Sequence, residues 1–380
     1  MADARSVRNL LNLVYEKSAS DLHLGVDRPP WLRCDGILKP TDLPKLNRQD
    51  MEDFARILLG PKREFLIDEQ NEIDFSYAPE DYPGRFRVNF YRQKGEIGLA
   101  LRLVTYVIPT FEELNLPPII QESSRFERGI IIITGTTGSG KSTTLAAMTD
   151  CINRERDSHI ITIEDPIEFF HFDNKAIINQ REVGIDTDSF IIALRAAMRE
   201  DPDVILVGEM RDRETVQTTF TAAITGHLVM TTLHTTDVLQ TINRVLDYYP
   251  SDMQKQARIM LSETIEAIFS MRLLPMIGGG RLPAIESMIA TARIRDYVLN
   301  PDETALIKMA MEEGEFDGMF TFDQYLLKLY RAKKITYKTA LRAATSPHDF
   351  QLLERKTTEF DAPITQSYYG STGGGGPAGK

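Results

Sequence analysis

The 380-residue sequence contains only two cysteines, Cys34 and Cys151, and they are far apart. Two such residues make neither a disulfide framework nor a paired-cysteine metal knuckle, and they fit the reducing conditions of a cytoplasm. No run approaches about 18 consecutive apolar residues, and the first five residues do not begin a secretory signal peptide. We therefore expect a chain that neither spans a membrane nor is secreted by that route.

Basic residues are also in the minority. The chain has 44 Lys and Arg against 55 Asp and Glu, and its net charge is -11 at pH 7. A protein that moves along nucleic acid usually carries a basic stripe, and none is visible here. The composition therefore disfavours a nucleic-acid translocase, and no nucleic-acid partner is expected. The length allows two domains and a tail.

Residues 1–108 are expected to form a small α+β domain. Apolar residues between 5 and 16 have helical spacing, and a second helix is expected over about 47–59. Short apolar segments, several of them alternating with polar residues and bounded by turn residues, predict strands. These strands are expected around residues 21–24, 31–33, 85–92 and 97–104.

The Pro-bounded segment 109–118 is interpreted as an interdomain linker. Beyond it, continuous apolar strands alternate with helix-length segments, which indicates a parallel sheet covered on both faces. The strands are expected at 130–134, 160–163, 204–207 and 228–232. An α/β domain would thus cover 119–345, with a mostly helical region over 255–345. Residues 346–380 are an extension whose Gly-rich end is expected to be disordered.

The most specific motif is a complete Walker A octet, GTTGSGKS, at 135–142. It follows a buried strand and opens a helix, the context in which such a loop cradles phosphates, and a chance glycine-rich turn would need neither. Lys141 is expected to contact the β- and γ-phosphates of ATP, and Ser142 is expected to bind Mg²⁺. The predicted nucleotide-binding residues are Gly135, Thr136, Thr137, Gly138, Ser139, Gly140, Lys141, Ser142 and Thr143.

Two further strand ends carry carboxylates. Glu209 follows the strand 204–207, where a carboxylate would hold Mg²⁺ directly or through water, although a strand-end glutamate is often merely solvated. Hydrolysis also needs a carboxylate that orients and deprotonates water. Glu164 is the candidate base. Asp165 would instead cap the next turn and Glu168 would be solvated, but the residue types alone do not rank these three.

His227 and His234 flank the apolar run 228–233. Their spacing, with no companion Cys or His, matches no zinc signature, so a metal site is not expected. Either histidine would sense the γ-phosphate from a strand end and is therefore a candidate catalytic residue. The alternative for each is a hydrogen-bonded structural histidine.

Arg87 and Arg102 lie on two adjacent predicted strands. A two-residue hairpin turn at Lys94 and Gly95 would place the two arginines directly opposite each other. Like charges in that position repel, and a bound anion would offset the repulsion. We expect the pair to clamp the triphosphate of an ATP on a neighbouring subunit, as arginine fingers do. The alternative is a solvated face neutralised by carboxylates such as Glu96.

Taken together, these blocks resemble the secretion-type ATPases, specifically the type IV pilus retraction branch called PilT and PilU, over about residues 6–345. The blocks that carry the resemblance are SDLHL at 20–24, PWLRCDG at 30–36, the Walker A octet, the Asp box at 163–168, NQREVG at 179–184, the Walker B run at 201–212 and the His box at 225–234. The resemblance implies a PAS-like N-terminal domain and a RecA-like ATPase domain. It also implies that Glu164 is the base, that Glu209 is the Walker B carboxylate and that His234 lies near the γ-phosphate. Arg87 and Arg102 would be intersubunit fingers.

The resemblance further implies a cytoplasmic homohexameric ring at the inner membrane, where hydrolysis pulls on a pilus platform protein. The extension ATPases carry a tetracysteine knuckle that this chain lacks, which favours retraction. Residues 293–297 keep only Ile294 and Arg295 of the PilT retraction motif, whereas 322–349 resembles the PilU extension. A PilU-like accessory motor, working with a paralogous retraction ATPase, is therefore favoured over a principal PilT-type motor. A binding subunit that does not hydrolyse ATP is disfavoured by Lys141, Glu164 and Glu209.

Overall fold

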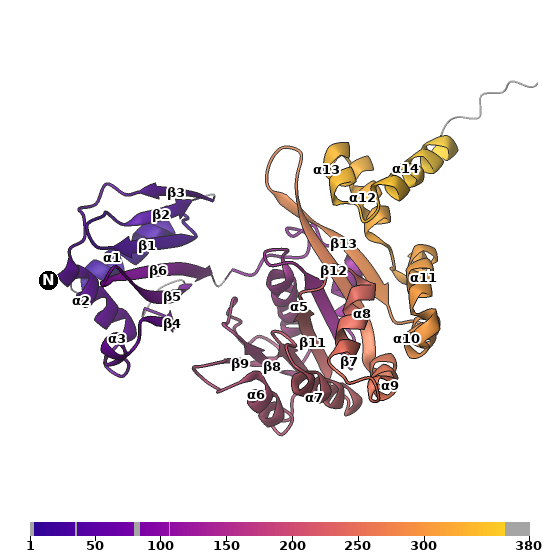
Figure 1. Cartoon of the computed structure of the whole chain (residues 1–380), viewed down its shortest axis with the longest axis horizontal. Helices are drawn as coiled ribbons and strands as arrows, with labels where there is room; N and C mark the ends of the chain where they lie inside the picture. The colour runs from indigo at the N-terminus through magenta and orange to yellow at the C-terminus, as the bar shows by residue number, and fades with distance from the viewer. Residues whose placement is uncertain (1–3, 35, 80–83, 106, 362–380) are drawn as a thin grey trace, which may run out of the picture.

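The computed structural model describes residues 4–34, 36–79, 84–105 and 107–361. These residues build two sheets, an antiparallel sheet of six strands and a mostly parallel sheet of seven (Figure 1). The described residues between the two sheets include the short helix α4 (Pro118–Ser123). The Gly-rich end that is predicted to be disordered lies outside the described residues. No helix in the described part of the chain is both long and apolar enough to cross a membrane.

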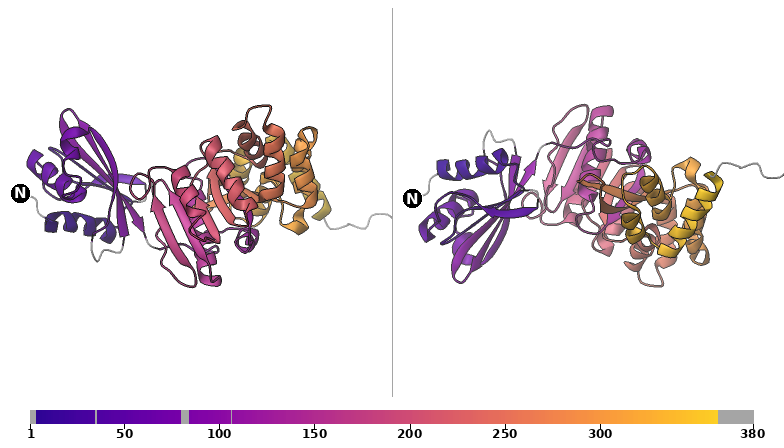
Figure 2. Two further views of the ribbon diagram at one scale, coloured as in Figure 1. Left: turned by 90° about the horizontal axis from the view of Figure 1, so that it is seen from below. Right: turned by 90° about the horizontal axis from the view of Figure 1, so that it is seen from above.

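The N-terminal sheet has the strand order β3-β2-β1-β6-β5-β4. Its strands are β1 (Asp21–Gly25), β2 (Trp31–Cys34), β3 (Ile37–Pro40), β4 (Glu72–Tyr77), β5 (Gly84–Gln93) and β6 (Glu96–Thr105), and its helices are α1 (Ala4–Glu16), α2 (Arg48–Leu59) and α3 (Leu66–Glu69). Alternate strand residues pack with α1 and α2 into one core, and α1 lies along one face of the sheet (Figure 2). The opposite face of the sheet carries polar side chains, which include Arg87 and Arg102. Both predicted helices and all four predicted strands are confirmed, while β3 and β4 were not predicted.

The β5–β6 hairpin has the predicted two-residue turn. Lys94 and Gly95 have φ angles of 52° and 78°, the paired positive values of a turn whose twist suits two antiparallel strands. The register that follows sets Arg87 opposite Arg102. Because side chains alternate along a strand, Phe86, Val88 and Phe90 all face the core.

The C-terminal sheet has the order β13-β12-β7-β11-β10-β8-β9. Its strands are β7 (Gly129–Gly135), β8 (His159–Glu164), β9 (Ile177–Glu182), β10 (Val204–Val207), β11 (Leu228–Leu233), β12 (Ile265–Pro275) and β13 (Arg281–Ile289). All pairs are parallel except the β12–β13 pair. The four predicted parallel strands are confirmed, and every residue of β7, β10 and β11 is buried.

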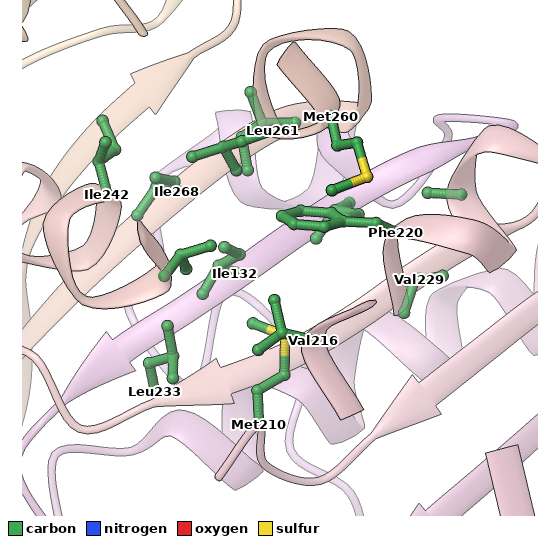
Figure 3. Close-up of a cluster of buried hydrophobic side chains, with 14 of the residues drawn as sticks. Ile132, Met210, Val216, Phe220, Val229, Leu233, Ile242, Met260, Leu261 and Ile268 are labelled. Atoms are coloured by element: carbon green, nitrogen blue, oxygen red, sulfur yellow. The ribbon is translucent and has the colours of Figure 1, made fainter. Parts of the chain in front are cut away.

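Helices cover both faces of this sheet. One face packs against α7 (Arg213–Ile224), α8 (Val238–Asp247) and α9 (Gln254–Thr264), as Figure 3 shows around Phe220, Ile242 and Leu261. The other face packs against α5 (Lys141–Glu155) and α12 (Phe322–Arg331). Ile132 belongs to the first core and its neighbour Ile131 to the second, because successive residues of a strand point to opposite faces.

The prediction of a mostly helical region over 255–345 is wrong for 265–289. Those residues form the β12–β13 hairpin, and β12 pairs with β7 to extend the parallel sheet. Three consecutive glycines, 278–280, all with positive φ, lie in the connection. Helices resume only later, as α10 (Ala292–Leu299), α11 (Ile307–Glu313), α12, α13 (Tyr337–Ala343) and α14 (Pro347–Asp361).

The two units also touch outside the connection. The Ser76 hydroxyl on β4 donates to both carboxylate oxygens of Glu182 on β9, at 3.0 and 3.2 Å. The Arg85 guanidinium lies over the Phe170 ring, 4.9 Å from its centre. Within the segment 109–118, Phe111 is buried in the core of the C-terminal unit. That unit therefore contacts its own N-terminal sheet through β9 and the loop after β8.

Candidate functional site

A cavity of about 410 Å³ opens at the carboxyl edge of the parallel sheet. The Walker A loop, the ends of β8, β10 and β11, and the β12–β13 hairpin all contribute to its wall. Ligands bind at this edge because the loops that follow parallel strands converge there. The cavity is lined by Thr137, Gly138, Gly140, Lys141, Ser142, Thr143, Leu145, Ala146, Glu164, Asp165, Pro166, Glu168, Phe169, His171, Phe190, Leu206, Gly208, Glu209, Arg211, Thr232, His234, Leu273 and Arg281.

The Walker A octet forms the predicted strand–loop–helix. Gly135 ends β7 with φ 143°, and a Cβ there would lie 2.5 Å from the Met271 carbonyl oxygen, so only glycine fits. Gly140, in the left-handed region, precedes the first residue of α5, and no side chain caps this helix end. The uncapped N–H groups and the positive end of the helix dipole together make an anion-binding site.

Polar groups inside the loop fit a bound phosphate. Lys141 is 8% exposed, and its ammonium donates to the carbonyl oxygens of Gly135, at 2.8 Å, and Thr136, at 3.2 Å. Burial lowers the pKa of Lys141, and Glu209 and Glu168 oppose this shift by attraction. The Ser139 hydroxyl is buried without a hydrogen-bond partner in the described structure. A loop with an enclosed cation, an unpartnered hydroxyl and free N–H groups is suited to a triphosphate and its metal ion.

Glu164 ends β8 and faces the cavity. Its Oε1 accepts hydrogen bonds from the Thr162 hydroxyl at 2.7 Å and from the Gln180 amide at 3.3 Å. Burial raises the pKa of Glu164 to about 7, and these hydrogen bonds reduce the shift without cancelling it. A carboxyl that titrates near neutral pH in a cavity has the properties of a general base.

Glu209 follows β10 and lies between the side chains of Arg211 and His234. Its carboxylate accepts from Arg211 Nε at 2.8 Å and lies 3.3 Å from His234 Nε2. Arg211 also reaches Asp165, at 3.3 Å. His234, at the end of β11, is thus held beside the predicted Walker B carboxylate. Ser142 lines the same cavity, so a hydroxyl and a carboxylate are available for Mg²⁺, which usually takes few protein ligands and keeps several waters.

The structure does not bring His227 to this cavity. His227 precedes β11, at the amino edge of the sheet, and its Nδ1 lies 2.8 Å from the Ala222 carbonyl oxygen. The cavity is at the carboxyl edge, so the catalytic assignment of His227 is withdrawn in favour of the structural alternative. His227 precedes β11 and His234 follows it, so the two histidines lie at opposite edges of the sheet.

Arg87 and Arg102 are also absent from the cavity of their own chain. None of its lining residues comes from the described part of the N-terminal unit. Arg87 is exposed, and Arg102 forms an ion pair with Asp21 at 2.8 Å. Glu96, the expected neutralising carboxylate, pairs instead with Arg48.

Sequence reasoning missed several residues of the site. Gln180 holds Glu164 from β9, and Arg211 joins Glu209 to Asp165. Both lie in blocks that the sequence singles out, 179–184 and 201–212, which was the available signal. Leu273 and Arg281 line the cavity from the hairpin that was expected to be helical.

The parallel sheet, the Walker A loop and the two carboxylates at strand ends define a P-loop nucleotide-binding domain with a smaller α+β domain attached. A family model described as "Type II/IV secretion system protein" matches residues 112–281. The chain belongs to this family, in the branch of type IV pilus ATPases that includes PilT and PilU.

The relatives support this assignment over nearly the whole chain. The chain is 42% identical to the "Type IV pilus retractation ATPase PilT" of Pseudomonas aeruginosa over 90% of its own length and 99% of that protein. It is 38% identical to the "Type IV pilus ATPase PilU" of the same organism, over 93% of its own length and 92% of that protein. A crystal structure of "the Pilus Retraction Motor PilT and Bound ADP" matches with a TM-score of 0.85 and 43% identity, covering 90% of this chain and 98% of that one.

Proposed function

We propose that this protein is an ATP-hydrolysing motor that drives type IV pilus retraction. The observation that carries the proposal is the cavity, in which a complete Walker A loop, Glu164 and Glu209 converge in a chain similar to PilT from end to end.

In the proposed mechanism, the Walker A N–H groups and Lys141 bind the triphosphate of ATP. Ser142 and Glu209 would hold Mg²⁺, which supplies charge neutralisation at the phosphates. Glu164 orients the attacking water and takes its proton, since its raised pKa suits a base at neutral pH. His234, held beside Glu209, faces the same cavity and responds to the γ-phosphate.

The proposed working form is a homohexameric ring on the cytoplasmic side of the inner membrane. Arg87 and Arg102 would complete the ATP site of the neighbouring subunit, in agreement with their absence from the cavity of their own chain. Closure of the ring around ATP would move the N-terminal unit and pull on an inner-membrane platform protein. No nucleic acid takes part.

Two roles within retraction remain as candidates. The helices α12 and α13 lie within residues 322–349, which resemble the PilU extension, and they favour an accessory motor beside a paralogous retraction ATPase. The 42% identity over 99% of PilT supports a principal motor. Deletion of the gene with and without its paralogue separates the two roles, because only loss of a principal motor abolishes twitching when the paralogue is present.

The test of retraction itself is the number of surface pili. Deletion, or the chromosomal Lys141→Ala variant, should leave pili that assemble but are not withdrawn, so pili accumulate while twitching falls. Purified protein should release phosphate from ATP, and the Lys141→Ala variant should not. A loss of surface pili in the deletion strain would contradict retraction.

A further inference from the structure

A row of polar side chains crosses five strands of the N-terminal sheet. Arg33 on β2 lies opposite Asp21 on β1, and Asp21 lies opposite Arg102 on β6. Arg102 lies opposite Arg87 on β5, which lies opposite Ser76 on β4. Three arginines therefore share one row with a single carboxylate, and that carboxylate belongs to the SDLHL block, for which the proposed mechanism has no use.

Both oxygens of Asp21 are engaged. Oδ1 accepts from Arg102 Nε at 2.8 Å, and Oδ2 accepts from the Ser20 hydroxyl at 2.7 Å. Arg33 Nε lies 3.7 Å from Oδ2. Although burial raises the pKa of Asp21, the hydrogen bonds from Ser20 and Arg102 hold it below its ordinary value, so the group is charged at neutral pH.

The two partners differ in exposure. The side chain of Asp21 is 10% exposed, whereas that of Arg102 is 68% exposed. The ion pair uses only Nε of the guanidinium, and the described structure contains no other hydrogen bond from the Arg102 side chain. A guanidinium has five N–H donors, so its two terminal amino groups stay available to a second acceptor. A buried, fixed anion thus holds one edge of an exposed cation.

We propose that Asp21 is a positioning residue for the arginine pair. It fixes the Nε edge of Arg102 and offsets the repulsion from Arg87, so that the terminal amino groups are oriented in advance toward the phosphates of a nucleotide on a neighbouring subunit. This inference rests on the proposed function, in which the pair acts as arginine fingers. Orientation that is established before the reaction lowers the barrier to hydrolysis more than it changes the affinity for ATP.

The test is steady-state ATP hydrolysis by the full-length protein carrying Asp21→Asn, which keeps the shape and removes the charge. We expect kcat to fall about tenfold, with KM for ATP changed less than about twofold. Arg102→Ala should lower kcat by about 10³-fold, as loss of an arginine finger does. Asp21→Asn in the Arg102→Ala background should cause no further loss. The matched control is Glu96→Gln. Glu96 lies on β6, as Arg102 does, and this change removes its ion pair with Arg48 on α2, so kcat should be unchanged.

The outcomes separate this inference from the proposed function. If Arg102→Ala is nearly inactive but Asp21→Asn has normal kcat, the positioning role is wrong and the finger role stands. If Arg102→Ala keeps full turnover, both are wrong. Losses that multiply in the double variant would show that Asp21 acts independently of Arg102, which also overturns the inference.

A second variant covers the case in which Asp21→Asn does not fold. Ser20 is exposed, and Ser20→Ala removes only the hydroxyl that holds Oδ2. It should lower kcat about twofold to threefold while the melting temperature stays unchanged, since a partly freed carboxylate still reaches Arg102. Normal kcat in Ser20→Ala would contradict the positioning role.

Discussion

Among single residues, Glu164 is held in the environment that a general base requires. Thr162 and Gln180 fix its Oε1 from β8 and β9, and burial raises its pKa to about 7. Asp165 is instead engaged by Arg211, whose guanidinium lies 3.3 Å from its carboxylate. Of the three acids that the sequence could not rank, the geometry therefore favours Glu164.

Turnover should accordingly depend on pH around neutrality. The base works when deprotonated, and its raised pKa means that the deprotonated fraction grows as the pH rises through about 7. We expect kcat to rise between about pH 6 and pH 8 and then level off. Glu164→Gln should lose about 10²- to 10⁴-fold in kcat while still binding ATP, measured by phosphate release and by equilibrium binding.

Glu168→Gln is the control, because Glu168 lines the same cavity and is the alternative base. It should keep the rising pH profile. If Glu168→Gln loses turnover and Glu164→Gln does not, the assignment is reversed.

At the scale of the elements, a buried carboxylate links two helices to the β12–β13 hairpin. Glu286 on β13 is 7% exposed and accepts from the N–H of Val238, at the start of α8, at 2.9 Å. The backbone of Phe322, at the start of α12, also favours the charged form of Glu286 and so opposes the rise in its pKa. His234 lines the cavity, and α8 begins four residues after it. Glu286 therefore joins the wall of the cavity to the C-terminal helices.

Glu286 should make stability depend on pH. Burial raises its pKa to about 7, above the ordinary value of a glutamate, so the unfolded chain loses this proton at lower pH than the folded one. Ionisation therefore favours the unfolded state as the pH rises from about 4.5 to 7, and stability falls across that window. The Glu286→Gln variant has no carboxyl to ionise at this position and so does not lose this stability. Its melting temperature relative to the wild type should therefore increase between pH 5 and pH 8.

Thermal unfolding of both proteins at the two pH values measures the effect. Glu263→Gln, an exposed position on α9, is the control and should differ from the wild type by the same amount at both pH values. A difference for Glu286→Gln that does not change with pH would contradict the raised pKa.

The helices and strands also show which parts of the structure can be predicted from the sequence. Strands without polar alternation and a two-residue turn are local signals, and they predicted four parallel strands and the opposition of Arg87 and Arg102. The strand β12 has no alternation because both its faces are buried, and such a run cannot be told from a buried helix by periodicity. The roles of Gln180 and Asp21 depend on neighbours distant in sequence, which no local pattern specifies.

For the whole molecule, the important fact is that the cavity has no lining residue from the described N-terminal unit. The arginine pair and the Walker A loop of one chain therefore do not meet in the cavity of that chain. If they meet between chains, two differently damaged subunits should complement each other.

Mixing purified Arg102→Ala and Lys141→Ala subunits should give more phosphate release than the sum of the two proteins assayed separately. The Arg102→Ala subunit keeps an intact cradle, and the Lys141→Ala subunit supplies the missing arginine. The control replaces Lys141→Ala by the double variant Lys141→Ala/Arg102→Ala, which offers no arginine and should give no gain. Equal rates in the two mixtures would show that the site is completed within one chain.

The turn at Lys94 and Gly95 has a consequence for how this protein tolerates change. It lies seven residues from both Arg87 and Arg102, yet together with the apolar pattern of β5 and β6 it sets which strand positions face each other. A single inserted or deleted residue there would shift β6 by one place against β5 and send one arginine toward the apolar core side. Natural variation in chain length should therefore be rare at this surface turn, even though nothing at the turn touches a nucleotide.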